Sequence, residues 1–557
     1  MLGLKYEKKF KKVNTISEIR LKEIKSFRLP IIRNRLIKML TESALLLLSI
    51  VEYLFLDDVQ EMIRLLESEF TKKRGPRAYP RTLVIGVLMF SLYKGMNSLK
   101  LIAEFCGDSI TLNKFTCGFN PKEDVFRRFL KDSDPRIIKS IFLYSLLKFE
   151  DYGWLDFARL FVDGTDALVN ASKNYLIHLE EIENVKKIKE LNLLHNGKRP
   201  QIKKFKEKIT QMLKEKEKYD EETIKTLKLA QKNSKIYCRY VFKNLDEIEQ
   251  AINENTKDYV SVSFHDAVML KSKKNSYEFG LNLQEIMNKN QILITGVLVK
   301  KANDSDVIGD VLDELKLSFE ILKELNQKYG NMDNDELFDF NNLLDHAIFI
   351  CDSGYFTNEN IESAYFNDME IVIMSRQLAR QNNNKKREKW LKQLEKTKKD
   401  LNKDKVSKKL CLRIYNAYAC PFDRLIEYQD KTLLNNEYNR RDEIHDELLE
   451  YKFHFECKDC SGCPFVEKYG KKCDCASIDD EMSLFKFNMT NDFANGEYTE
   501  YYADRLPNSE CINGFHKRKT GILYLLCRNF TANVNEIVFR NLLYNIRRLR
   551  SLKDTIT

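Results

Sequence analysis

Three acidic residues that lie far apart in the sequence have neighbours that could bring them together in space. Asp163 directly follows an apolar, strand-like run over 158–162, and Asp352 directly follows a second such run over 347–351. Glu510 lies in the polar segment that opens the last helical stretch. Carboxylates at the ends of neighbouring strands can converge, and such a cluster needs a cation to offset its self-repulsion. Carboxylate oxygens favour Mg²⁺ or Mn²⁺, and two such ions about 4 Å apart can drive phosphodiester displacement.

Either aspartate has a simpler interpretation when it is considered alone. Aspartate at the end of a strand is a common turn residue, because its side chain accepts hydrogen bonds from the backbone that follows. Support for a catalytic role of these acids must therefore come from the rest of the sequence. The chain has neither a Ser-His-Asp arrangement nor a GxxxxGK[ST] phosphate loop, and the missing loop argues against ATP dependence.

A second group of residues with metal-binding chemistry is a run of closely spaced cysteines. Its members are Cys457, Cys460, Cys463, Cys473 and Cys475. Two overlapping CxxC steps and a later pair can supply four thiolates to a tetrahedral, structural Zn²⁺. Because five thiols are candidates for four positions, the ligand set stays open, and free thiols are the alternative.

Composition and charge limit the class of protein. The chain has 557 residues, 43% hydrophobic and 32% charged, with only 19 Gly and 9 Pro, which excludes collagen-like and wholly disordered chains. Residues 1–40 carry 12 basic against 3 acidic residues (+9), and residues 511–557 carry 9 against 2 (+7). The net charge of +10 then leaves 10 − 9 − 7 = −6 for the middle. Basic ends favour a polyanionic partner, although solvated basic faces would give the same pattern.

The sequence also predicts a compartment. The most apolar run, over 44–56, is interrupted by Glu52 and is shorter than the ~20 residues of a membrane span. The basic N-terminus is followed by no apolar stretch with a small-residue cleavage site, as a signal peptide would be. Thirteen cysteines, an odd number, favour a reducing environment. We therefore expect a cytoplasmic protein without membrane association.

Periodicity predicts the order of the elements. Residues 41–150 have helical spacing, and a Lys/Glu-rich helical insert follows the first strand over roughly 175–235. Residues 277–300 have the pattern of a β-hairpin, and residues 303–305 are candidates to cap the next helix, which Gly330 should end. The remaining expected elements are strands at 347–351 and 370–374, a Lys-rich helical run near 385–405, and helix over about 497–553. A hairpin followed by strands alternating with helices indicates a mixed α/β sheet.

The motifs around the three acids resemble those of a known family. VDGTDALVNAS (162–172), KANDSD (301–306), CDSGYF (351–356) and YADRLPNSECINGFHK (502–517) are similar, in this order, to motifs of bacterial insertion-sequence DDE transposases. The last motif resembles the branch with a Tyr-Arg-Glu-Lys signature, which falls here on Tyr502, Arg505, Glu510 and Lys517. Four residues separate Arg505 from Glu510, where the signature usually has three, whereas the six residues between Glu510 and Lys517 match it. Weaker similarity extends to RAYPRTL (77–83) and NIRRL (545–549).

The resemblance implies an architecture. Its catalytic core would be an RNase H-like mixed sheet, with a helical N-terminal domain and a large insertion before the last catalytic helix. The expected boundaries are a basic tail over 1–40, a helical DNA-binding domain over 41–150, core over 151–375 with its insert near 175–235, a cysteine-bearing insertion over 376–495, and core again over 496–557.

The resemblance also implies a function. Asp163, Asp352 and Glu510 would hold Mg²⁺ or Mn²⁺, and Tyr502, Arg505 and Lys517 would contact DNA. The expected activity is binding of terminal inverted repeats, DNA cleavage and strand transfer on double-stranded DNA, by a homodimer in the synaptic complex at the bacterial nucleoid.

Three other interpretations remain open on the sequence alone. A co-opted transposase could bind DNA without catalysis, and a nuclease or resolvase could use the same fold and metals. In a zinc-stabilised scaffold protein, the acids at the strand ends would be coincidental.

Overall fold

The computed structural model describes most of the chain after residue 41. The described ranges are 42–68, 79–116, 118–173, 175–190, 202–242, 244–254, 258–271, 276–330, 336–382, 384–399, 406–441, 444–517 and 523–556. The basic tail expected over 1–40 therefore lies outside the described residues. Within the described ranges, no helix is both long and apolar enough to cross a bilayer.

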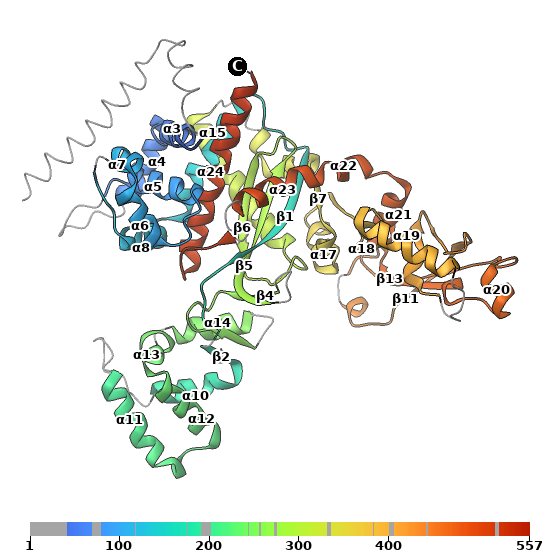
Figure 1. Cartoon of the computed structure of the whole chain (residues 1–557), viewed down its shortest axis with the longest axis horizontal. Helices are drawn as coiled ribbons and strands as arrows, with labels where there is room; N and C mark the ends of the chain where they lie inside the picture. The colour runs from blue at the N-terminus through green and yellow to red at the C-terminus, as the bar shows by residue number, and fades with distance from the viewer. Residues whose placement is uncertain are drawn as a thin grey trace, which may run out of the picture.

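A mixed sheet lies at the centre of the molecule (Figure 1). Its strands are β1 (Arg159–Leu168), β4 (Val268–Lys271), β5 (Tyr277–Asn288), β6 (Leu293–Val299), β7 (Ile348–Cys351), β8 (Ile371–Ile373) and β14 (Leu523–Tyr524). The main path runs β4-β5-β1-β7-β8, with β6 beside β5 and β14 beside β1. β1 is antiparallel to β5 and parallel to β7, which is parallel to β8. The predicted mixed sheet and β5–β6 hairpin are confirmed.

Strand β1 is longer than its sequence pattern predicted, so the predicted end of this strand was wrong. We expected the strand to end before Asp163, but β1 continues past it and pairs with β5 from Leu160 to Leu168. The side chains of Asp304 and Gln284 come so close to the backbone at Gly164 that a Cβ there would collide with them. Glycine is therefore needed here for space within the strand and not for a turn. Asp163 therefore projects from the middle of a paired strand.

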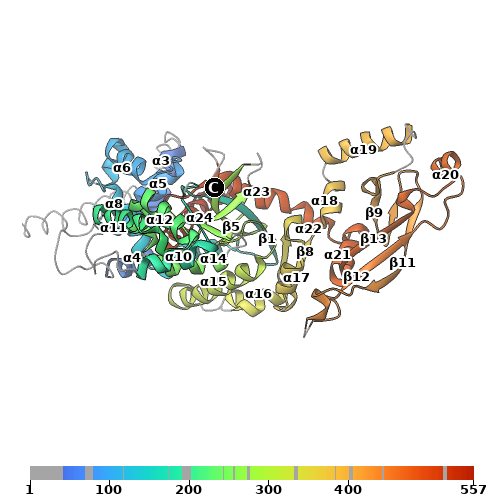
Figure 2. The same ribbon diagram turned by 90° about the horizontal axis from the view of Figure 1, so that it is seen from below.

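Helices cover both faces of the sheet. Thr295 of β6 hydrogen-bonds Glu314 of α15 (Ile308–Tyr329), whereas the next residue, Gly296, approaches Asn541 of α24 (Phe530–Ile556). Because successive residues of a strand point to opposite faces, α15 and α24 lie on opposite sides. Helix α23 (Arg505–His516) packs against β1 and β5, and Figure 2 shows these strands between α23 and α15.

The start of α15 corrects a second local prediction. Residues 303–305 do not cap this helix; instead the side-chain oxygen of Asn360 accepts hydrogen bonds from the backbone N–H groups of Val307 and Ile308, at 2.8 and 3.0 Å. Asn360 belongs to α17 (Asn358–Tyr365), so the cap comes from another element. Gly330 ends α15 as predicted. A short helix, α16 (Phe340–His346), leads into β7.

The N-terminal region is helical, as predicted. Its helices are α3 (Glu42–Leu54), α4 (Asp57–Ser68), α5 (Arg81–Tyr93), α6 (Leu99–Asp108), α7 (Ile110–Phe115), α8 (Glu123–Asp132) and α9 (Pro135–Glu150). Its apolar side chains join those of the sheet, α15 and α24 in one continuous core. A buried ion pair at 2.5 Å between Lys139 of α9 and Glu314 of α15 crosses the junction.

The first insertion leaves the sheet after β1 and has a separate small core. It contains β2 (Leu176–His178), α10 (Leu179–Glu190), α11 (Ile202–Lys214), α12 (Glu221–Lys232), α13 (Ser234–Ile236), α14 (Leu245–Glu254) and β3 (Tyr259–Ser261). Phe205 and Ile209, from the apolar stripe of α11, are buried in that core. The insert thus extends beyond the expected end near 235 and includes a two-stranded ribbon, β2–β3.

The second insertion contains a sheet that periodicity did not predict. Its elements are α18 (Arg376–Asn382), α19 (Asn384–Lys399), β9 (Leu412–Ile414), β10 (Ala417–Ala419), β11 (Leu425–Leu433), β12 (Glu450–Glu456), α20 (Pro464–Tyr469), β13 (Ser477–Ser483) and α21 (Leu484–Asn495). The strands are antiparallel, in the order β13-β12-β11-β10-β9. This domain projects from one side of the central sheet (Figure 2).

Candidate active site

The sheet register places two of the predicted acids side by side. Val162 of β1 pairs with Cys351 of the parallel strand β7, and Asp163 and Asp352 are the next residue on each chain segment. Asp352 starts a short 3₁₀ turn, η4 (Ser353–Tyr355), and its carboxylate accepts a hydrogen bond from the backbone N–H of Gly354. One aspartate is therefore fixed by strand pairing and the other by its own turn.

Asp163 lies in a crowded and poorly hydrated environment. Its side chain is 18% exposed. Burial raises the pKa of Asp163 to about 7; the Arg505 guanidinium opposes this rise, and the charges of Asp352, Asp304 and Glu285 add to it. Desolvation and like charges both penalise an ionised carboxylate. The site therefore carries more negative charge than its protein surroundings neutralise, a condition that favours a bound cation.

Helix α23 contacts this acidic site through one face. Asn513 Nδ2 donates to Asp163 Oδ2 at 2.8 Å, and Arg505 Nη1 lies 3.9 Å from Asp163 Oδ1. Ser509, between them, is buried, and its hydroxyl has no partner among the described residues. Positions 505, 509 and 513 are spaced four apart, so they lie along one side of the helix. That side faces β1.

The other signature residues lie around this face at different depths. Tyr502, on α22 (Thr499–Ala503), is half-buried, and its ring lies 5.3 Å from that of Phe493. Burial raises the pKa of Tyr502 to about 12, Arg505 opposes the rise, and the charge of Asp352 adds to it. Glu510 is exposed, and its charge is not among those that shift the pKa of Asp163. Lys517, half-buried, directly follows the last turn of α23.

The donor set suits a hard divalent cation that also uses ligands from its substrate. Among the described residues, no three His, Cys, Asp or Glu side chains gather as a ready metal site. Mg²⁺ usually takes one or two carboxylates and fills its other positions with water and substrate phosphates. Asp163 and Asp352 supply such a pair of carboxylates. Glu510 lies three residues before Asn513 on α23, but its side chain is exposed, so the structure does not bring this third predicted acid together with the two aspartates.

Two acids near the site were not predicted. Asp304 Oδ1 accepts hydrogen bonds from Asn282 Nδ2 and Gln284 Nε2, both at 2.9 Å. Asp304 lies in the KANDSD motif, so the resemblance held a signal for it. Glu285 faces Asp163 across the β1–β5 ladder, and its Oε1 lies 2.8 Å from His516 Nε2 of α23. No motif marked Glu285, because its closeness depends on strand register.

The five predicted zinc-ligand cysteines share the second insertion with two more, Cys411 and Cys420. All seven are free thiols. Cys457 and Cys460 have their sulfur atoms 3.0 Å apart, and Cys475 interacts with both Cys411 and Cys473. Cys420 Sγ accepts hydrogen bonds from the backbone N–H groups of Phe422 and Arg424, each at 3.3 Å. The thiols therefore gather, but as smaller groups rather than around one point.

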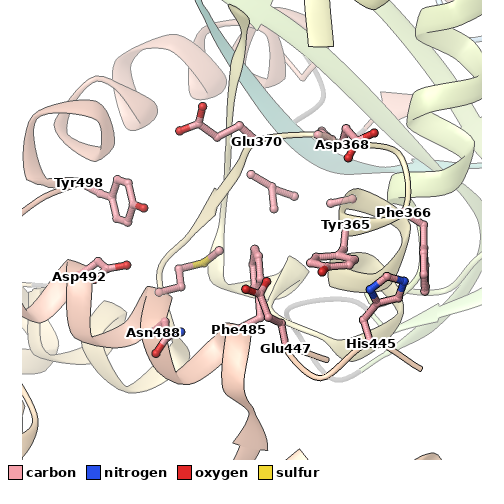
Figure 3. A pocket seen from close by; sticks show the side chains of 14 residues that line it. Tyr365, Phe366, Asp368, Glu370, His445, Glu447, Phe485, Asn488, Asp492 and Tyr498 are labelled. Carbon is pink, nitrogen blue, oxygen red and sulfur yellow. The ribbon is translucent and has the colours of Figure 1, made fainter. Parts of the chain in front are cut away.

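An acidic pocket lies between the core and the second insertion (Figure 3). Aromatic residues from both sides line it, including Tyr365 and Phe485, together with the carboxylates of Asp368, Glu370, Glu447 and Asp492. No Lys or Arg is among its lining residues. Its negative charge would repel a phosphate backbone, so this pocket is no candidate for DNA binding.

The strand order defines the class of protein. An antiparallel hairpin beside β1, parallel neighbours β7 and β8, and aspartates on β1 and after β7 are the arrangement of an RNase H-like DDE domain.

The comparison with known families agrees with this class. The family model described as "Transposase DDE domain" matches residues 260–546, just over half of the chain, and the chain therefore belongs to the insertion-sequence DDE transposases. The match includes Asp352 and Glu510, and Asp163 lies on the strand that pairs with the matched β5 and β7. No curated protein matches the chain.

Proposed function

We propose that this transposase binds the terminal inverted repeats of its insertion sequence and catalyses metal-dependent cleavage and strand transfer at the repeat ends. The observation that carries this proposal is the pairing of β1 with β7, which puts Asp163 and Asp352 next to each other in a site with excess negative charge. Bound there, Mg²⁺ or Mn²⁺ would activate a water or 3′-hydroxyl and stabilise the leaving oxygen. Glu510 would complete the set of carboxylates from α23.

The signature cations would hold the DNA backbone against these acids. Arg505 lies beside Asp163, and its planar guanidinium can donate two hydrogen bonds to one phosphate. Lys517 would bind another phosphate as a point charge at the end of the helix. Tyr502 keeps its hydroxyl proton at neutral pH, since even the ordinary tyrosine pKa of 10 lies well above 7 and burial raises it further, so it can donate to a phosphate oxygen. Stacking on an unpaired base is the other role for this ring.

Double-stranded DNA, as transposon end and as target, is the proposed partner. The helical domain predicted over 41–150 would bind the terminal repeats mainly through phosphates, with the basic tail adding charge. Two ends must be held together before they are joined to a target. We therefore propose a homodimer in the synaptic complex, acting at the nucleoid.

The test uses the full chain, a labelled duplex that carries the repeat ends, a target plasmid, and Mg²⁺ or Mn²⁺. We expect cleaved ends and a joined product from the parent protein, and neither from Asp163→Asn or Asp352→Asn, which should still bind DNA. Asp156→Asn, just before β1, is the matched control and should remain active within about twofold.

Three results would contradict the proposal. Binding without cleavage by the parent protein would indicate a co-opted DNA-binding protein. Cleavage without a joined product would indicate a nuclease. Activity that survives Asp163→Asn would show that the acids at the strand ends are not the catalytic site.

A further inference from the structure

Asn513 gives the two oxygens of Asp163 different neighbours. Oδ2 accepts a hydrogen bond from the Asn513 amide at 2.8 Å, whereas Oδ1 lies 3.9 Å from the Arg505 guanidinium. When Asp163 is ionised its carboxylate can only accept hydrogen bonds, and the amide presents its N–H₂ side to it. This contact fixes the rotation of the carboxylate about its χ2 bond, because one oxygen is held and the other is not.

The other end of the Asn513 amide is left without a partner. Its Oδ1 atom is buried and makes no hydrogen bond with the described residues. Buried polar side-chain atoms are mostly paired in native proteins, and an exception calls for an explanation, such as a catalytic role or a water or ion that completes the bonding. A residue whose only role was to fill space beside β1 would gain nothing from this amide.

The position of α23 does not depend on the Asn513 contact. One turn further on, His516 Nε2 lies 2.8 Å from Glu285 Oε1, and both side chains are fully buried. Glu285 faces Asp163 across the β1–β5 ladder. Cys511 Sγ also lies 3.2 Å from the Tyr544 hydroxyl of α24. Separate contacts therefore attach the helix to the sheet and to α24.

We propose that Asn513 is a positioning residue of the active site, which holds Oδ2 of Asp163 so that Oδ1 is kept for a divalent cation. Its own carbonyl oxygen would gain a partner when water or substrate enters the site. This inference rests on the proposed function, because it takes Asp163 as a metal ligand. Residues that orient metal ligands typically contribute 10–100-fold to metal affinity.

The experiment measures Mn²⁺ binding to the full chain without DNA, by the EPR signal of free Mn²⁺. Asn513→Ala should weaken Mn²⁺ binding about 10–100-fold and leave the melting temperature of the metal-free protein nearly unchanged. Asn508→Ala is the matched control. Asn508 is buried on the same helix, but its amide donates to the backbone oxygen of Asp504 at 2.7 Å, away from the acids. Its Mn²⁺ affinity should stay within about twofold of the parent.

A second variant keeps the test decisive if Asn513→Ala folds poorly. Asn513→Asp places a carboxylate against Asp163, so the metal-free protein should melt at a lower temperature. Mn²⁺ should then raise its melting temperature more than it raises that of the parent, because binding relieves the added repulsion. Parent-like melting with an equal rise would overturn the role of Asn513.

The two proposals fail in different ways. If Asn513→Ala binds Mn²⁺ like the parent while Asp163→Asn does not bind it, Asn513 has no positioning role and the proposed function stands. If Asp163→Asn also binds Mn²⁺ like the parent, the acidic site is not the metal site, and both proposals fail.

Discussion

The acidic site and the cysteine-rich insertion hold their reactive groups in different ways. Asp163 projects from a strand that is paired on both sides, and Asp352 follows directly from a neighbouring strand. In the insertion, Cys457, Cys460 and Cys463 lie on a connection after β12, and Cys420 lies at the turn between β10 and β11. The acidic site is therefore held by hydrogen-bonded strands of the central sheet, whereas these cysteines lie on loops that connect the strands of the second sheet.

This difference determines how far each site is formed before a ligand arrives. Strand pairing fixes the positions of Cα atoms, so the two aspartates stay close even though their charges repel. Loop cysteines can gather only as far as their turns bring them, and here they form small groups of thiols. We expect cation binding at the acidic site to relieve a repulsion that already exists. At the cysteines, we expect it to draw side chains together.

The largest expected effect comes from removing a carboxylate at the sheet. Asp163→Asn and Asp352→Asn should each lower the rate of end cleavage by about 10⁴-fold, as loss of a catalytic acid does in other enzymes. Neither should destabilise the metal-free protein, because each removes one of several crowded negative charges. Rates come from gel-based cleavage assays and stability from thermal melting. A loss of activity that matches a loss of fold would show that the carboxylates are structural.

The pH dependence of stability tests whether Asp163 lies in a desolvated environment with other negative charges nearby. The folded state raises the pKa of Asp163 to about 7 from its ordinary 3.8, so between these values the folded protein binds more protons than the unfolded chain. Stability from this group is therefore full below about pH 4 and is lost as the pH rises to about 7. The difference corresponds to about 4 kcal/mol.

Urea unfolding with EDTA measures this effect. The stability advantage of Asp163→Asn over the parent should grow between pH 4 and 7 and stay constant above that range. A difference that is independent of pH would mean that Asp163 is not held in a desolvated, negative environment, and the contrast with the cysteine domain would then disappear.

The sequence predicted the parts of the acidic site that depend on local patterns. Apolar runs before Asp163 and Asp352 marked their strands without knowledge of the fold. Asn513 and Glu285 could not be found in this way, because each acts through a partner more than one hundred residues away that only strand register or helix docking brings near.

The sheet of the second insertion was missed for a related reason. β11 is mostly exposed or half-buried along its length, so its residues show little of the alternation that marks a strand. Cys411 and Cys420 precede Cys457, the first cysteine of the dense run, by 46 and 37 residues, and only the fold places them beside that run.

A further prediction compares the exposed acid Glu510 of α23 with the two aspartates that the strands hold in place. Its side chain is exposed on α23, one turn from Asn513, so it must move inward to contribute to metal binding. We expect Glu510→Gln to lower cleavage about 100-fold, less than loss of either strand-held aspartate. Glu500→Gln, an exposed acid on the preceding helix, is the control and should have little effect. A parent-like rate for Glu510→Gln would remove this residue from the site and leave Ser509 as the position to examine.

Substitution of a cysteine in the second insertion should have the smallest effect on catalysis, although its effect within that insertion should be large. Five of the thiols are part of a hydrophobic core that is separate from the core beneath the catalytic sheet. If they bind zinc, the purified chain should contain at least one Zn²⁺ by mass spectrometry. Cys420→Ser should lower that content, because Cys420 lies among both groups of thiols. Cleavage of DNA ends should stay within about twofold of the parent, since the sheet that positions Asp163 and Asp352 does not depend on this core.

Cys238→Ser, a buried thiol in the first insertion, is the matched control and should leave the zinc content unchanged. A parent protein purified without chelators that contained no zinc would contradict the zinc prediction. The gathered thiols would then be explained by apolar packing alone, because free cysteine is among the most frequently buried side chains.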